Sequence, residues 1–221
     1  MRKLVVALLL LVLLVVGGDR LAARLAAGQA ESQLVSRGFT NPHVVVHGFP
    51  FLTQALDKRF DHVTVTATAL SRSGLVAQDV HADLRDVRVD TQSSGTAALA
   101  TGTGIVTWKE IATAADSPLK LGPGPNGEVR VTGRFEILGQ SLDVVAEAIL
   151  SATGKEIRLR PTHLALQSGG VLDASLSRQL QSLLDLTYPV QGLPAGVSLT
   201  ALTPEQGGIR VAVSAKNVAV H

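Results

Sequence analysis

Strands follow one another along most of this chain without helices between them, and that succession limits the fold more than any other feature. Residues 63–69 read VTVTATA, so that valine and alanine alternate with threonine and every second side chain faces the same side. Alternation recurs over 141–151, and the stretches 75–89, 128–138 and 156–166 are also typical of strands. Strands that adjoin strands predict an α+β fold with a mostly antiparallel sheet.

Two segments have helical periodicity instead. Between Asp19 and Arg37, alanines and a leucine recur at spacings of three and four residues, which places them on one helical face. Farther along, Asp173 stands where a helix N-cap is expected, and Leu172, Leu176, Leu180 and Leu184 recur every fourth residue. These leucines predict a second helix with one apolar face.

Shorter features complete the expected organisation. Thr107 and Glu110 have the spacing of a capping box, which predicts a short helix that ends near residue 115. Residues 91–98 (TQSSGTAA) and 122–127 (GPGPNG) are expected to be a loop and a turn. The last two strands, 197–203 and 208–218, are expected to form a hairpin.

The N-terminus has the order of an export signal. Arg2 and Lys3 precede an apolar run from Leu4 to Val16, as a charged n-region precedes an h-region. As a helix, this run would extend about 20 Å, which is less than the roughly 30 Å core of a bilayer. We expect an export signal that is either cleaved, near Gly17-Gly18 or Ala26-Ala27-Gly28, or retained as a short anchor.

The export signal fixes the expected topology and the domain organisation. The positive end of the apolar run should stay on the cytoplasmic side, and the rest of the chain should be exported. This divides the chain into residues 1–18, the signal or anchor, and residues 19–221, a single domain. The chain has no cysteine, so the exported domain must fold without disulfides.

The charge of the domain argues against nucleic acid as a partner. Four of the 20 Lys and Arg residues and one of the 18 Asp and Glu residues precede Gly28. The remainder of the chain therefore carries 16 bases against 17 acids and has no basic stripe. Nucleic-acid binding normally requires such a stripe.

No motif indicates catalysis or metal binding. GPGPNG has the glycine spacing of a dinucleotide-binding loop, but a strand is expected after it where that loop requires a helix. His43 and His47 lie in a predicted strand, where four residues extend about 13 Å, too far for two ligands of one ion. No G-x-S-x-G sequence is present. We therefore predict no catalytic residue, no metal and no cofactor.

The aromatic residues are few and unevenly distributed. Of five Phe, one Trp and one Tyr, four lie in or near HGFPFLTQAL (47–56), namely Phe39, Phe49, Phe51 and Phe60. Pro50 restricts the backbone, so a stiff elbow is expected there. The pattern leaves two interpretations open. The rings of Phe49 and Phe51 either plug the end of the core or contact lipid at a cavity mouth or a membrane.

Three segments together resemble one known family. They are DRLAARLAAGQAESQL after the apolar run, HGFPFLTQAL followed by HVTVTATAL, and LPAGVSLTALTPEQGGIRVAVSAKNVAV at the C-terminus. On these segments the chain resembles the actinobacterial LmeA-like phospholipid-binding family, formerly a domain of unknown function. GFPFLTQ is the most specific string, and residues 90–130 contribute little to the resemblance.

The resemblance implies both a place in the cell and a fold. It implies an exported envelope protein of actinobacteria at the outer surface of the plasma membrane. It also implies phospholipid binding and, in mycobacteria, support for the elongation of lipoglycan mannan. The implied fold is tubular and lipid-binding-like, with one or two long helices packed along a long, curved, mostly antiparallel sheet.

Within such a fold the expected lipid contacts are apolar. Phe49, Phe51 and Leu52 are expected to contact acyl chains or the membrane. The cavity is expected to be closed by Leu176, Leu180 and Leu184. Two other classes stay open. An envelope enzyme that acts on a lipid-linked sugar or lipid ester would need convergent polar groups in its pocket, whereas a carrier would need an apolar lining. A structural envelope protein would have a solid core.

Overall fold

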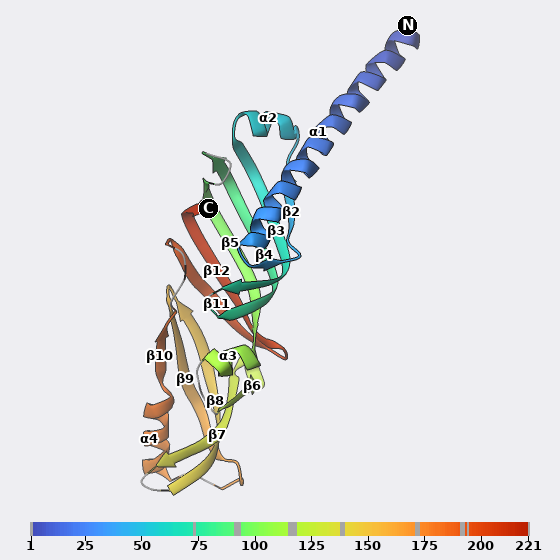
Figure 1. Cartoon of the computed structure of the whole chain (residues 1–221). Coiled ribbons are helices and arrows are strands. Elements are labelled where there is room, and N and C mark those ends of the chain that lie inside the picture. Colours follow the sequence, from blue (N-terminus) through green and yellow to red (C-terminus); the bar gives the residue numbers. More distant parts are fainter. Residues whose placement is uncertain are drawn as a thin grey trace. The chain divides into compact units, whose positions relative to one another are not determined.

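The computed structural model describes residues 2–72, 74–90, 94–114, 119–137, 140–170, 173–190, 193 and 195–220 (Figure 1). The helices are α1 (Arg2–Ser36), α2 (Phe51–Leu56), α3 (Trp108–Ala114), the 3-10 turn η1 (Pro125–Gly127) and α4 (Ala174–Leu184). The strands are β1 (Phe39–Thr40), β2 (His43–His47), β3 (Arg59–Arg72), β4 (Leu75–Val89), β5 (Gly95–Thr107), β6 (Lys120–Pro123), β7 (Val129–Ile137), β8 (Gln140–Thr153), β9 (Glu156–Leu166), β10 (Leu186–Pro189), β11 (Val197–Glu205) and β12 (Gly208–Val220).

The predicted α+β class is confirmed, and the strands are divided between two sheets. One sheet has seven strands in the order β1-β3-β4-β5-β12-β11, with β2 paired to β3. The other has five strands in the order β10-β9-β8-β7-β6. The pairings of β2 with β3 and of the neighbours in the five-stranded sheet are all antiparallel.

The chain forms two compact units, each built from separate parts of the sequence. The first unit comprises Met1–Ala69, Val80–Gly102 and Ala215–His221, and the second comprises Leu70–Asp79 and Thr103–Ser214. The helix α1 belongs to the first unit and continues without a break through residue 18, where the sequence predicted the end of the signal segment. The division into 1–18 and 19–221 stays a prediction. Among the residues that the structure describes, no helix has a stretch long and apolar enough to cross a membrane.

In the first unit, the second half of α1 is fastened to strand β2. The Glu31 carboxylate accepts a hydrogen bond of 2.8 Å from the backbone N–H of Val44 and lies 3.0 Å from Nδ1 of His43. Val44 itself is buried, as are Ala67 of the neighbouring strand β3 and Ala97 of β5 in the same sheet. Small side chains of this kind allow a core without large rings, in agreement with the aromatic-poor composition.

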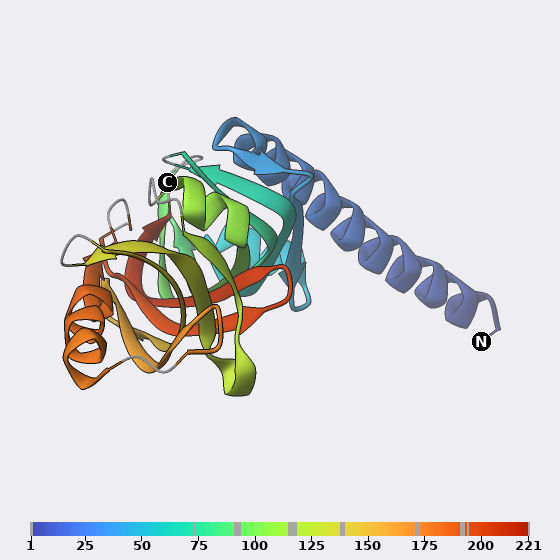
Figure 2. The same cartoon turned by 90° about the horizontal axis from the view of Figure 1, so that it is seen from below.

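In the second unit, α4 packs on the five-stranded sheet, beside β9 (Figure 2). The predicted N-cap is confirmed, because the Asp173 carboxylate accepts hydrogen bonds from the backbone N–H groups of Ser175 and Leu176. The apolar face of the helix meets Val131 and Val144 of the sheet. Leu172, which the sequence placed on the same face, lies outside the described residues.

Most of the expected strands are present. Strand β4 occupies the predicted range, and Asp86 has a positive φ of 49° where the apolar alternation slips. The three meander strands and the closing hairpin are confirmed. The prediction of a loop over 91–98 was wrong from Gly95 onward, because β5 begins there, and 91–93 lie outside the described residues. No sequence pattern predicted helix α2.

Candidate functional site

The segment HGFPFLTQAL forms an elbow between strand β2 and helix α2. Gly48 adopts a φ of +99°, and the bond between Phe49 and Pro50 is cis. The side chain of Gln54 lies across Gly48, where a Cβ would meet its amide nitrogen at 2.5 Å. Gln54 donates to the carbonyl of His47 at 3.3 Å and accepts from the N–H of Asp61 at 3.2 Å. The positive φ of Gly48 therefore favours glycine at this position, and Gln54 ties the elbow to β2 and β3.

Asp19 of α1 holds the elbow in place. Its side chain is 1% exposed, and its Oδ1 accepts a hydrogen bond of 2.8 Å from the N–H of Leu52, in the first turn of α2. The N-cap position of α2 is Pro50, which has no side-chain acceptor, so α1 supplies the acceptor instead. The backbone N–H of Leu52 lowers the pKa of Asp19, burial opposes this effect, and the N–H of Phe51 and the charge of Arg20 lower the pKa further.

The two phenylalanines of the elbow face different surroundings. Phe51 is 6% exposed and stacks on Phe60, with 5.9 Å between ring centroids. Phe49 is 53% exposed, and the guanidinium carbon of Arg20 lies 5.7 Å from its ring centroid. Leu52 and Leu56 of α2 are also exposed, Leu56 to 83%. We call Phe49, Leu52 and Leu56 the elbow surface. Exposed apolar side chains on one short segment are available for contact with another apolar body.

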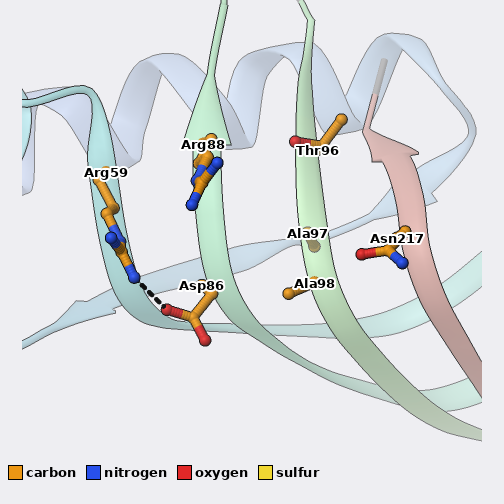
Figure 3. A pocket seen from close by; sticks show the side chains of 7 residues that line it. All are labelled: Arg59, Asp86, Arg88, Thr96, Ala97, Ala98 and Asn217. Carbon is orange, nitrogen blue, oxygen red and sulfur yellow. Dashed lines mark hydrogen bonds and ion pairs between the residues drawn. The ribbon is translucent and has the colours of Figure 1, made fainter.

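A polar pocket lies at the ends of four strands of the first unit (Figure 3). Its volume is about 250 Å³, and two alanines and five polar side chains line it. The polar lining consists of Arg59, Asp86, Arg88, Thr96 and Asn217. Arg59 comes from β3, directly after α2, and donates from Nη2 to Oδ1 of Asp86 at 3.0 Å. Asp86 and Arg88 lie in the strand that the sequence predicted over 75–89.

The comparison with known proteins identifies the family. Residues 17–214 match the family described as LmeA-like phospholipid-binding. The chain belongs to this family. No curated protein matches the sequence. Membership agrees with the resemblance found in the sequence and supports a role in lipid binding, for which the LmeA-like family is described.

The sequence expected six lipid-contacting residues in this LmeA-like chain, and the structure places them in two groups. Phe49 and Leu52 lie on the elbow surface, with Phe51 buried beneath it. The leucines of α4 lie in the second unit, where Leu180 is fully buried against Val144 and Leu184 packs with Val129, Val131 and Ala146. Leu176 is partly buried. Their contacts with lipid stay a prediction.

Three of the six histidines of the LmeA-like chain form a polar cluster on strands β2, β3 and β4. The rings of His47 and His62 stack with 4.3 Å between centroids. The carboxylate of Asp83 lies 2.7 Å from Nε2 of His62 and 2.8 Å from Nε2 of His81. These contacts, first of all the one with His62, lower the pKa of Asp83 to about 2. Within the described ranges, no three His, Asp or Glu side chains are arranged to hold a metal ion.

Sequence reasoning missed Asp19, Gln54 and the pocket. Asp19 is the one acidic residue before Gly28, and a single carboxylate in this apolar and basic segment could have indicated a specific contact. Its partner Leu52 is 33 residues away, so the contact itself could not be read from the sequence. Asn217 joins Arg59 and Arg88 only because β12, which is distant in sequence, lies in the same sheet as β3 and β4.

Proposed function

We propose that the chain is an exported, non-catalytic phospholipid-binding protein of the cell envelope, which acts at the outer surface of the plasma membrane. The observation that carries the proposal is the elbow surface of Phe49, Leu52 and Leu56, fixed to α1 by Asp19. Membership of a phospholipid-binding family supports the choice of ligand. Support for lipoglycan or envelope-lipid biogenesis in an actinobacterium is part of the same proposal.

The position of the elbow on α1 favours a membrane as the apolar body. Asp19 follows the apolar run Leu4–Val16 by three residues, which correspond to about 4.5 Å along a helix. If this run is retained in the bilayer as a short anchor, the elbow surface lies at the lipid interface. Arg20 and Arg24, which flank the run, suit anionic headgroups there.

The elbow surface supplies only part of the required binding energy. Full burial of a Leu or Phe side chain is worth about 1.5–3 kcal/mol. About half of the Phe49 and Leu52 side chains and most of Leu56 remain to be buried. Their insertion is therefore worth about 3–5 kcal/mol, comparable to a single lipid chain that binds membranes reversibly. A second contact with the lipid is needed for stable attachment.

The polar pocket does not favour an enzyme. Nucleophilic catalysis requires a nucleophile that is hydrogen-bonded to a base. The hydroxyl in the pocket belongs to Thr96, and the carboxylate of Asp86 is paired with Arg59. At about 250 Å³ the pocket is also below the roughly 300–1,000 Å³ of sites that enclose drug-sized ligands. We therefore propose a binding role.

Lipid analysis and vesicle flotation test the proposal. Native mass spectrometry of gently purified protein should detect a bound phospholipid mass that is lost on denaturation. The protein should also float with phospholipid vesicles. The double variant Phe49→Asp/Leu56→Asp should bind vesicles weakly, because it places charges beside acyl chains. Leu186→Asp, at an exposed leucine of the second unit, is the control and should bind normally. A lipid-free protein that ignores vesicles would contradict the proposal.

A further inference from the structure

The pocket at the strand ends is built by the backbone of four neighbouring strands. Strands β3, β4, β5 and β12 are consecutive in the seven-stranded sheet and contribute Arg59, Arg88, Thr96 and Asn217 (Figure 3). The N–H of Val89 donates to the carbonyl of Lys58 at 3.0 Å. This bond fixes the end of β4 beside the start of β3, so the two arginines are held on adjoining strands.

Local backbone irregularities shape the pocket. Asp86 and Asn217 both adopt a positive φ of 49°, which regular strands do not contain, and both side chains line the pocket. Gly95 lies where a Cβ would collide with the carbonyl oxygen of Arg88. A larger residue at 95 would push β5 away from β4, and Thr96 with it.

The charges of the pocket are unbalanced. Arg59 is paired with Asp86 through one nitrogen, whereas the guanidinium group of Arg88 has no hydrogen-bond or ion-pair partner within the part of the chain that the structure describes. Two guanidinium groups and one carboxylate give the lining a formal charge of +1. Thr96 and Asn217 add neutral donors. Guanidinium groups present a planar fork of N–H donors that matches the oxygens of a phosphate.

The pocket also adjoins the elbow surface along the chain. Leu56 is the last residue of α2, and Arg59 follows it by three residues. An exposed leucine and a cationic pocket thus lie at the same end of β3. A phospholipid has the same combination of chemistry, an acyl region next to a charged phosphate.

We propose that this pocket binds the phosphate of a phospholipid headgroup, with Arg88 and Arg59 as the charged donors and Thr96 and Asn217 as neutral donors. The inference rests on the proposed lipid-binding function and supplies the second contact that the elbow surface requires. The volume of about 250 Å³ has room for a headgroup phosphate, and the acyl chains stay outside with the elbow surface. Asp86 competes with the phosphate for Arg59.

The test uses ligands that differ only in the phosphate. The full chain is titrated with short-chain phosphatidic acid and with the matching diacylglycerol. Arg88→Gln and Arg59→Gln should each weaken phosphatidic acid binding by about tenfold or more, since a hydrogen bond to a charged group is worth about 1.5–3 kcal/mol. Their affinity for diacylglycerol should not change. Arg37→Gln, at an exposed arginine near the end of α1, removes the same charge elsewhere and should bind as the natural chain does.

A gain-of-function variant separates binding from folding. Asp86→Asn removes the competing carboxylate, and asparagine tolerates the positive φ of this position. Its affinity for phosphatidic acid should rise about threefold to tenfold, because the guanidinium of Arg59 no longer pairs with a carboxylate and can bind the phosphate. Circular dichroism and the urea midpoint show whether the variant is folded. If both are unchanged and the affinity for phosphatidic acid falls, misfolding does not explain the loss and the assignment is overturned.

The remaining outcomes distinguish this inference from the proposed function. If the natural chain binds phosphatidic acid and the Arg59 and Arg88 variants bind it equally well, the pocket assignment is overturned and the lipid-binding function stands. If the natural chain binds no phospholipid, both are overturned. Inorganic phosphate and glycerol phosphate should compete weakly with phosphatidic acid. Binding of inorganic phosphate as tight as that of the lipid would identify a free-phosphate site and overturn the headgroup assignment.

Discussion

Replacement of each elbow phenylalanine by alanine should separate a core residue from a lipid contact. Phe51 is 6% exposed and stacks on Phe60, so Phe51→Ala leaves a cavity in the first unit. Phe49 is 53% exposed, and the guanidinium of Arg20 lies over its ring. The two variants remove the same atoms two residues apart, so each serves as the control for the other.

The burial of the two rings sets the expected magnitudes. Truncation of a buried phenylalanine costs about 3–5 kcal/mol of unfolding free energy. Phe49 is about half buried, so its truncation should cost about half of the roughly 1.5–3 kcal/mol of unfolding free energy that full burial of such a side chain contributes. A cation–π contact adds about 0.5 kcal/mol at an exposed site, for a total near 1.5 kcal/mol. With an m-value of about 2 kcal/mol per molar urea, Phe51→Ala should lower the midpoint by about 1.5–2.5 M, and Phe49→Ala by less than about 1 M.

Two assays on each variant show whether its phenylalanine is a core residue or a lipid contact. Urea unfolding, followed by circular dichroism, reports stability, and co-flotation with phospholipid vesicles reports lipid binding. Phe49→Ala should remain folded and bind vesicles more weakly than the natural chain. If Phe49→Ala is destabilised as much as Phe51→Ala, or if it binds vesicles normally, Phe49 is not a lipid contact and the reasoning about the elbow surface is refuted.

Three further predictions concern the core, the pH dependence and the topology. Leu180→Ala should cost about 3–5 kcal/mol in urea unfolding because Leu180 is fully buried, whereas Leu186→Ala at an exposed position should cost little. Asp83 has a pKa lowered from 3.8 to about 2, so its ionised carboxylate stabilises the fold fully above about pH 4, and this stabilisation is lost as the pH falls toward 2. In Asp83→Asn, the melting temperature should therefore depend less on pH over this range. A reporter that is active only in the cytoplasm, fused after His221, should be silent, and an active reporter there would contradict export.

The sequence predicted the features that depend on neighbouring residues. Alternation of apolar and polar side chains located β3 and β8, because a strand exposes its two faces at a period of two residues. The cap of α4 was predictable for the same reason, since Asp173 and the N–H groups that it accepts are within three residues of each other.

The features that the sequence could not predict depend on distant contacts. Helix α2 has six residues, which is too short to be stable alone. The N–H of Leu52 in its first turn donates a hydrogen bond to Asp19, which belongs to another helix. Residues 91–98 are small and polar, which predicted a loop, but strand β5 begins at Gly95. The backbone there approaches the carbonyl oxygen of Arg88 so closely that only a glycine fits. The pocket follows from strand order, which local patterns do not contain.

The contact between Asp19 and Leu52 makes the site of signal processing matter for the mature protein. A peptidase that cuts after Gly18 leaves Asp19 as the first residue, and the new α-ammonium group adds a positive charge beside its carboxylate. A peptidase that cuts after Ala27 removes Asp19 and leaves the N–H of Leu52 without its acceptor. The first product keeps the elbow fastened to α1, and the second releases it, so the N-terminal residue of the mature chain determines whether the elbow surface is held in place.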